Sequence, residues 1–393
     1  MKIENKINIL YLGAFPPDFL IRRTGGKIDS LYRDDQAIIR GLRAQDNVNL
    51  SVITSPDISS WPYGPLFVCR ETNKEEGVTM VSSLNVSIIK QFWTIISLTI
   101  EAVNYIRKSS ETVVAIIPYV VFRHVFSLRL LKLIFGKKIM QAVVVPDIFF
   151  PSNWFLKRVN LITEKMASKF DAFVLYTEKM AEHLHVQSGH YEVIEGFREI
   201  SDRKPVPDDI FKIVYAGSLN INYGIGRLLE AMSMIDDSQI HLHLYGSGTA
   251  EKLIREVCRK DERIVFHGKV SNKEAGDAIY SASVLINPRN ANDGDYTEYS
   301  FPSKDIEYMA TGVPTLLCKL PGMPKEYYGH FIDIEDGTPE QIAKAIIKMK
   351  TMSSEDRNAI GQDARGFIVE RMDCKKQGKR IVRLFNRLLL CRI

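Results

Sequence analysis

Short runs of β-branched and aliphatic residues alternate with longer helical patterns along almost the whole of this chain. This order is typical of βαβ units, in which helices connect the strands of a parallel sheet. The first half predicts a helix at 177–184 and strands at 7–12, 50–54, 113–118, 139–145, 171–176 and 192–194. The pattern therefore favours an α/β fold over an all-helical or all-strand one.

A polar segment at 199–209, which contains two prolines, interrupts this alternation as an interdomain linker would. The alternation then restarts, with strands predicted at 212–216, 240–245, 264–266, 284–287 and 314–318 and helices at 226–234, 250–260, 272–281 and 303–310. A chain of 393 residues also favours two domains. We expect an N-terminal domain at 1–200, a C-terminal domain at 201–375 and a closing helix at 376–393.

Composition excludes several classes of protein. A hydrophobic content of 45% and a charged content of 25% indicate a folded globular protein. A net charge of +5 is too small to indicate a nucleic-acid partner. The apolar stretches at 92–100 and 112–122 are too short to span a membrane, and 9–15 is expected to be a strand and not a signal peptide. Five scattered cysteines favour a reducing cytoplasm and no metal site.

The loop that follows the predicted strand 212–216 is rich in glycine. A strand that ends in Gly217 and Ser218 and a helix that begins after Gly224 can direct backbone N–H groups at a phosphate. The segment lacks the lysine and the spacing of a P-loop. A tight strand-to-helix turn explains the same glycines equally well, and it explains the Tyr245-Gly-Ser-Gly248 loop better.

The densest signal is the polar loop at 287–302 and the helix after it, which we expect Ser303 to cap. Lys304 in the first turn opposes the helix dipole, which makes sense if an anion binds there. Arg289 would add a bidentate donor, and Glu307 could accept hydrogen bonds from ribose hydroxyls. The alternative is a structural ion-pair network among these three side chains.

Together these segments resemble the C-terminal half of glycosyltransferase family 4, whose members use nucleotide-sugar donors. The matching segments are 215–219, 223–231, 244–248, 263–268, 285–289 and 299–312. The resemblance implies a GT-B fold, in which two Rossmann-like parallel-sheet domains face each other across a cleft. It also implies an acceptor-binding first domain, a donor-binding second domain and a retaining, metal-independent hexosyl transfer without a cofactor.

The resemblance assigns roles to single residues. Glu307 corresponds to the acid that holds the donor ribose, and Glu298 to the acid that contacts the transferred sugar, although it lies one position farther from Glu307 than is usual. The family commonly has a basic pair in the first loop, where this chain has Ser218 and Tyr223, so Arg289 and Lys304 are expected to stabilise the leaving diphosphate instead. The other expected donor contacts are Gly217, Ser218, Asn222, Val270, Tyr299, Ser300, Phe301 and Ser303.

The first domain is expected to bind a glycan or a lipid-linked glycan, with Gly25, Gly26 and His124 near the acceptor; a lone histidine beside core strands is also explained as a buried structural side chain. Residues 107–169 contain eleven Lys and Arg and only three acids, together with Phe149, Phe150, Trp154 and Phe155. This mixture suits contact with anionic lipid at the inner face of a membrane. The basic tail at 375–393 suits either such contact or packing against the first domain.

Three functions remain open at this stage. The first is a glycosyltransferase of surface polysaccharide or glycolipid synthesis. The second is a GT-B enzyme of another kind, such as a sugar-nucleotide epimerase, and the third is a non-catalytic scaffold that binds sugar nucleotides. Asp293-Gly-Asp295 matches an Asp-x-Asp metal motif, but the surrounding loops resemble those of GT-B enzymes, so we expect no metal.

Overall fold

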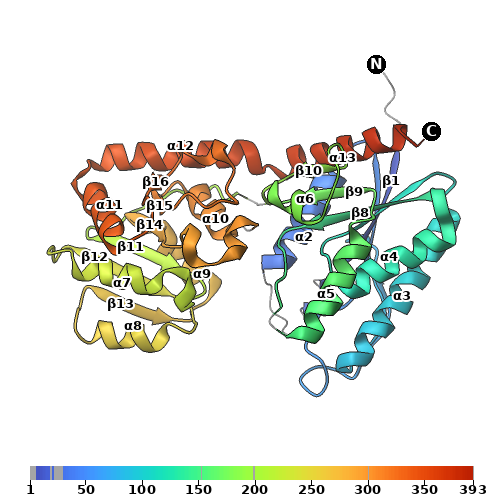
Figure 1. Cartoon of the computed structure of the whole chain (residues 1–393), viewed down its shortest axis with the longest axis horizontal. Coiled ribbons are helices and arrows are strands. Elements are labelled where there is room, and N and C mark those ends of the chain that lie inside the picture. Colours follow the sequence, from blue (N-terminus) through green and yellow to red (C-terminus); the bar gives the residue numbers. More distant parts are fainter. Residues whose placement is uncertain are drawn as a thin grey trace. The chain divides into compact units, whose positions relative to one another are not determined.

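The computed structural model describes residues 6–17, 20–21, 30–151, 153–197, 200–299 and 301–392 (Figure 1). The chain divides into two compact units. Unit 1 consists of Met1–Arg198 and Asp373–Ile393, and unit 2 consists of Glu199–Met372. The last helix thus belongs to the same unit as the first half of the chain.

Unit 1 is built on an eight-stranded sheet with the strand order β10-β9-β8-β7-β1-β2-β5-β4. Only the β4–β5 pair is antiparallel, and β3 and β6 form a separate antiparallel pair. The six strands expected from the sequence are confirmed, whereas β3 to β6 were not expected. The bounds are β1 Ile7–Gly13, β2 Val48–Thr54, β3 Phe67–Val68, β4 Glu71–Asn73, β5 Val78–Met80, β6 Ser83–Leu84, β7 Val113–Ile117, β8 Ile139–Val145, β9 Ala172–Leu175 and β10 Tyr191–Val193.

The helices of unit 1 cover both faces of this sheet, so β7 and β8 are buried at every position. Helices α3, α4 and α5 lie side by side (Figure 1), while α13 packs against α2. Gln45 donates a hydrogen bond to the carbonyl of Lys375, and Arg380 pairs with Glu192 of β10. The bounds are α2 Ser30–Arg43, α3 Ser87–Lys108, α4 Phe122–Phe135, η1 Gly136–Lys138, α5 Trp154–Ala167, α6 Lys179–His183 and α13 Cys374–Leu390.

Unit 2 is built on a six-stranded parallel sheet with the order β13-β12-β11-β14-β15-β16. The strands are β11 Phe211–Ala216, β12 Ile240–Tyr245, β13 Ile264–Gly268, β14 Val284–Asn287, β15 Thr315–Leu317 and β16 Ile332–Asp333. The helices are η2 Ile221–Tyr223, α7 Ile225–Ser233, α8 Glu251–Cys258, α9 Asn272–Tyr280, η3 Ala291–Asp293, η4 Asp295–Glu298, α10 Ser303–Thr311, η5 Lys325–Tyr327, α11 Pro339–Thr351 and α12 Ser354–Met372. All strands and helices expected in this half are confirmed.

One local expectation is wrong. Ser303 does not cap α10: it is the first helical residue, and the N-cap position is occupied by Pro302, which provides no side-chain cap. Proline suits this position because its fixed backbone angle precedes the helix and no side-chain acceptor is needed. Within the described parts of the chain, no helix is both long and apolar enough to cross a bilayer.

Candidate functional site

Two loops of unit 2 meet at the carboxyl edge of its sheet, where parallel sheets bind ligands. One follows β11, and the other follows β14 and leads into α10. Gly224, with φ of 78°, lies so close to the carbonyl of Pro288 that a β-carbon on it would be 2.2 Å from that oxygen. Arg227 donates to the same carbonyl over 2.9 Å. Backbone and side-chain contacts therefore hold the two loops against each other.

Lys304 reaches from the first turn of α10 to the end of β11. Its ammonium donates a hydrogen bond to the carbonyl of Ala216 and lies 4.6 Å from the centre of the Tyr215 ring. A β-carbon on Gly217 would be only 1.4 Å from the Lys304 Nζ atom, so residue 217 has to be glycine for the ammonium to occupy this position. The structure thus brings two of the predicted site residues, Lys304 and Gly217, together.

The pKa of Lys304 is lowered to about 8, mainly by burial and also by the nearby Arg289, while Glu307 and Asp305 oppose the shift. Burial disfavours the charged form because the ammonium loses its hydration. An anion placed next to the ammonium would compensate for that loss and raise the pKa again. The low pKa of the buried ammonium is therefore consistent with a site that binds an anion.

Arg289, from the loop after β14, lies against the loop that follows β11. Its guanidinium carbon is 3.6 Å from the centre of the Tyr223 ring, which is a cation–π contact. The Nε atom of Arg289 is buried and has no hydrogen-bond partner among the described residues. A buried N–H group without a partner is unusual in a folded protein and is satisfied when a ligand supplies the acceptor.

Asp305 is a residue of this region that sequence reasoning missed. Its carboxylate is buried and accepts a hydrogen bond of 2.6 Å from the side chain of Asn287, the last residue of β14. Burial raises the pKa of Asp305 to about 6. The sequence did contain a signal for this contact, because Asn287 ends a buried strand and Asp305 lies in the first turn of the next helix. This pair fixes the start of α10 relative to β14 and so positions Lys304.

The remaining predicted donor contacts differ in exposure. Glu307 and Tyr299 are partly exposed, and Val270 packs at the edge of a small core cluster that includes Tyr245. The ring of Phe301 is buried against Tyr327, with ring centres 4.7 Å apart, so only its backbone can face a ligand. Ser218, Asn222, Glu298 and Ser303 are exposed. Ser300 lies outside the described residues.

The first acid of the Asp-x-Asp motif has a structural partner. The Asp293 carboxylate receives two hydrogen bonds from Arg227, of 2.8 and 2.9 Å, and a third from the backbone N–H of Asn290. Among the residues that the structure describes, no group of three His, Cys, Asp or Glu side chains is placed to hold a metal ion. The contacts of Asp293 instead hold the loop after β14 against α7.

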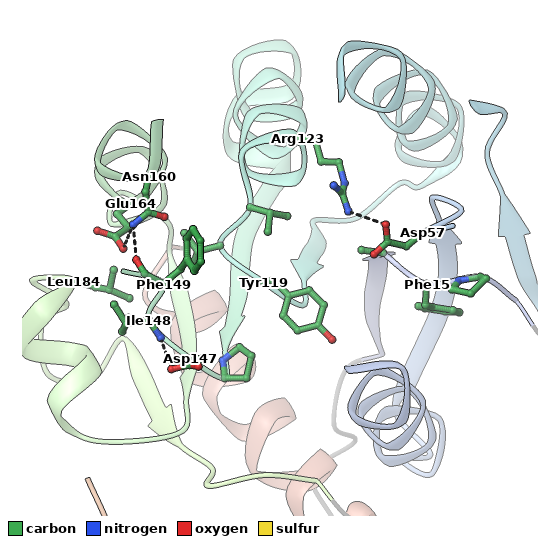
Figure 2. Close-up of a pocket in the computed structure, with 15 residues that line it drawn as sticks. Phe15, Asp57, Tyr119, Arg123, Asp147, Ile148, Phe149, Asn160, Glu164 and Leu184 are labelled. Atoms are coloured by element: carbon green, nitrogen blue, oxygen red, sulfur yellow. Dashed lines mark hydrogen bonds and ion pairs between the residues drawn. The ribbon is translucent and has the colours of Figure 1, made fainter. Parts of the chain in front are cut away.

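Unit 1 has its own pocket at the carboxyl edge of its sheet, with a volume of about 390 Å³ (Figure 2). One wall is charged, since Arg123 and Asp57 lie 3.7 Å apart, and another is polar, since Asn160 donates to Glu164 over 2.9 Å. Apolar and aromatic side chains form the rest. The lining residues are Ala14, Phe15, Pro16, Asp57, Tyr119, Val120, Val121, Arg123, Pro146, Asp147, Ile148, Phe149, Asn160, Glu164 and Leu184.

His124 supports this edge from inside. The ring is fully buried, its Nε2 atom lies 3.0 Å from the carbonyl oxygen of Gly13, and burial lowers its pKa to about 3. A neutral imidazole therefore connects α4 to the end of β1, and it does not line the pocket. Gly25 and Gly26, the other residues expected near an acceptor, lie outside the described residues.

Comparison with known proteins finds a family that is similar to the domain containing the Lys304 site. Residues 210–351 match the family described as glycosyl transferases group 1. This part of the chain is similar to the group 1 glycosyltransferases. The match covers most of unit 2, including both loops of the site. No curated protein matches the chain in sequence.

The likeness to solved structures extends over the fold of both units. HepE of Anabaena in complex with UDP is 14% identical, with a TM-score of 0.66 over 96% of this chain and 99% of that one. Sucrose-phosphate synthase of Thermosynechococcus elongatus is 14% identical, with a TM-score of 0.67 over 98% and 100%. The lipopolysaccharide outer core galactosyltransferase WaaB is 12% identical, with a TM-score of 0.62 over 98% and 100%. The chain therefore has the two-domain GT-B fold.

Proposed function

We propose that the protein transfers a sugar from a nucleotide-sugar to a glycan or lipid-linked glycan acceptor in surface polysaccharide or glycolipid synthesis. The observation that carries this proposal is the position of two cations, Lys304 and Arg289, against the glycine-containing loop after β11. Both come from the loop and helix after β14, and both reach the place where the family commonly has a basic pair.

The donor would bind with its diphosphate between these cations. The ammonium of Lys304 and the guanidinium of Arg289 would stabilise the negative charge that develops as the diphosphate leaves, an effect that is often the largest in catalysis. Glu307, one turn into α10, would accept hydrogen bonds from the ribose, and Glu298 would contact the transferred hexose. The relative HepE binds UDP and UDP-glucose, which makes a uridine nucleotide the first donor to test.

The reaction proposed retains the anomeric configuration of the donor sugar, with the donor phosphate accepting the proton of the attacking hydroxyl. Under this proposal the protein supplies positive charge and orientation, and needs neither a nucleophile nor a metal ion. The partners of Asp293 support metal independence, because its carboxylate is already used by Arg227 and Asn290.

The acceptor would bind in the pocket of unit 1. Its carboxylates, Asp147 and Glu164, can accept hydrogen bonds from sugar hydroxyls, and the rings of Phe15, Tyr119 and Phe149 offer surfaces against which sugar rings can pack. The relative WaaB is a galactosyltransferase of the lipopolysaccharide core. A lipid-linked glycan at the cytoplasmic face of a membrane fits this mixed lining.

The test is donor turnover in EDTA with a panel of UDP-, GDP- and ADP-sugars, with and without an extract of lipid-linked glycans. We expect release of one nucleoside diphosphate that depends on the extract, and an unchanged anomeric configuration by NMR. Lys304→Ala should lower turnover more than it lowers donor affinity. Isomerisation of a donor without acceptor would indicate the epimerase alternative, and binding without turnover of any donor would indicate the scaffold.

A further inference from the structure

Helix α3 exposes an apolar stripe to solvent. Ile88, Phe92, Ile96 and Ile100 recur every four residues and thus share one side of the helix, and their exposed fractions range from 56% to 75%. The opposite side, which includes Ile95, Leu98 and Ile106, is buried in unit 1. A helix that is apolar on both sides is normally buried on both sides, so its exposed apolar side is a candidate interaction surface.

Helix α5 continues this surface with a mixture of aromatic and basic side chains. Trp154 is 69% exposed, and Phe155, Leu161 and Ile162 are also exposed. Lys157, Arg158 and Lys165 are exposed between them, and the Arg158 guanidinium lies 5.7 Å from the centre of the Trp154 ring. The one acid in this helix, Glu164, contacts His183 and Asn160.

Helix α4 joins the two. It packs against α3 on one side and α5 on the other, and all three helices lie next to each other in Figure 1. The sequence of α4 contains no acid, and its end exposes Leu133 and Ile134 just before Lys137. The exposed large apolar residues of this surface, which we call the α3–α5 face, are Ile88, Ile89, Phe92, Trp93, Ile96, Ile100, Leu133, Ile134, Phe149, Phe150, Trp154, Phe155, Leu156, Leu161 and Ile162.

We propose that the α3–α5 face docks on the surface of a bilayer that contains anionic phospholipids. Charge complementarity selects this occupant: on α5 the apolar side chains alternate with the exposed Lys157, Arg158 and Lys165. Interfacial segments of this kind insert rings among acyl chains and pair cations with phosphates. Large exposed apolar patches on a folded protein mark interaction sites. A pocket of about 220 Å³ beside α3, lined in part by Trp93, Ile96 and Ile100, adds room for an apolar group.

The basic helix α13 does not provide the same surface. Its apolar residues, which include Ile381, Phe385 and Leu388, are buried in unit 1, and its outer side exposes mainly cations such as Lys379 and Arg383. Cations alone attract anionic lipid weakly and do not insert into the bilayer. Variants of α13 therefore test whether charge without exposed aromatic side chains is enough for vesicle binding.

The face also reaches the pocket of unit 1. Phe149 lies in the loop that leads into α5, lines that pocket and is 64% exposed. A glycan anchored in the bilayer by its lipid would therefore arrive beside the pocket mouth. This last step rests on the proposed function, whereas docking itself does not.

The test is sedimentation with vesicles of phosphatidylcholine alone and of phosphatidylcholine mixed with phosphatidylglycerol. We expect binding to the mixed vesicles only, weakened by high salt. All three tryptophans, Trp61, Trp93 and Trp154, lie in unit 1. We expect their fluorescence to shift to shorter wavelength on binding and to be quenched by lipids brominated on the acyl chains.

Two double variants test the face. Phe92→Ser with Ile96→Ser, and Phe155→Ser with Ile162→Ser, should each weaken vesicle binding at least tenfold and leave UDP binding unchanged. Lys379→Glu with Arg383→Glu on α13, and Ile347→Ser with Val369→Ser in unit 2, should have little effect. UDP binding needs no vesicles and vesicle binding needs no donor, so the two proposals fail separately.

Three results would overturn the proposal. The first is a wild-type protein that does not sediment with anionic vesicles. The second is a loss of vesicle binding in the α13 variant but not in the face variants. The third is a wild-type dimer that ignores vesicles and dissociates in the face variants, which would show that a second copy of the chain covers this surface.

Discussion

The guanidinium of Arg289 stacks on the ring of Tyr223, with its central carbon 3.6 Å from the ring centre. Tyr223 occupies a position where a cation was expected from the resemblance, and the structure places a cation on it from the loop after β14. The ring provides a binding surface that orients the guanidinium without neutralising it. A tyrosine in the first loop is thus compatible with a positively charged site.

Tyr223→Ala should weaken binding of the donor nucleotide about tenfold, because a partly desolvated cation–π contact contributes about 1–2 kcal/mol to the position of the guanidinium. Tyr223→Phe keeps the ring and is the matched control. Isothermal titration calorimetry with UDP measures both. Equal affinities of the alanine variant and the wild type would show that the stack does not orient Arg289 for binding.

The affinity for nucleoside diphosphate should fall as the pH rises through about 8, since burial lowers the pKa of Lys304 to that value and only the ammonium attracts phosphate. The decrease approaches tenfold per pH unit until the pKa of the bound state is reached. Lys304→Ala should bind weakly and without this inflection. A wild-type affinity that is constant from pH 7 to pH 9.5 would contradict the assignment of Lys304.

For folding, the same pKa has the opposite consequence. The ordinary pKa of lysine is 10.5, so between pH 8 and pH 10.5 the folded chain binds fewer protons at Lys304 than the unfolded chain does. The contribution of this group to stability therefore rises with pH in that window. Relative to Lys304→Ala, the wild type should become more stable between these pH values in chemical denaturation.

Gly217→Ala should displace the Lys304 ammonium, because the new methyl group would lie 1.4 Å from the present position of Nζ. The far end of a lysine can move, so we expect UDP affinity to fall about as far as in Lys304→Ala while the protein stays folded. Gly276→Ala is the control: it lies in α9 with nothing within 4 Å of the new atom, and it should stabilise the fold by about 0.5–1 kcal/mol. An unchanged affinity of Gly217→Ala would count against the site.

Asp293→Asn should lower the free energy of unfolding by about 1–3 kcal/mol, because two charge-assisted hydrogen bonds to Arg227 are weakened. UDP affinity of the wild type should be the same in EDTA and in Mg²⁺. A requirement for Mg²⁺ that disappears in Asp293→Asn would instead assign this carboxylate to a metal site.

Strand and helix periodicity predicted most of the fold, because buried parallel strands such as β7 are continuous apolar runs. Sequence reasoning did not find β3 to β6, whose two- and three-residue strands are too short for a period to show. It also assigned a cap to Ser303, where the chain uses Pro302. Local patterns do not determine such choices.

The site was less accessible to sequence reasoning than the fold. Arg289 and Lys304 stood out because their charge lies at a strand end and at a helix start. The contacts that orient them, to Tyr223 and across Gly217, depend on loops that are distant in sequence. Asp305 was missed because a carboxylate in the first turn of a helix is ordinary until its burial is known.

The most direct test of the central account is calorimetric titration of the purified protein with UDP, GDP and ADP in EDTA at pH 7, alongside Glu307→Ala and Lys304→Ala. The account predicts saturable binding of one of these nucleotides to the wild type and at least a tenfold loss of affinity in each variant. No binding of any of the three, or equal affinity in the variants, would contradict it.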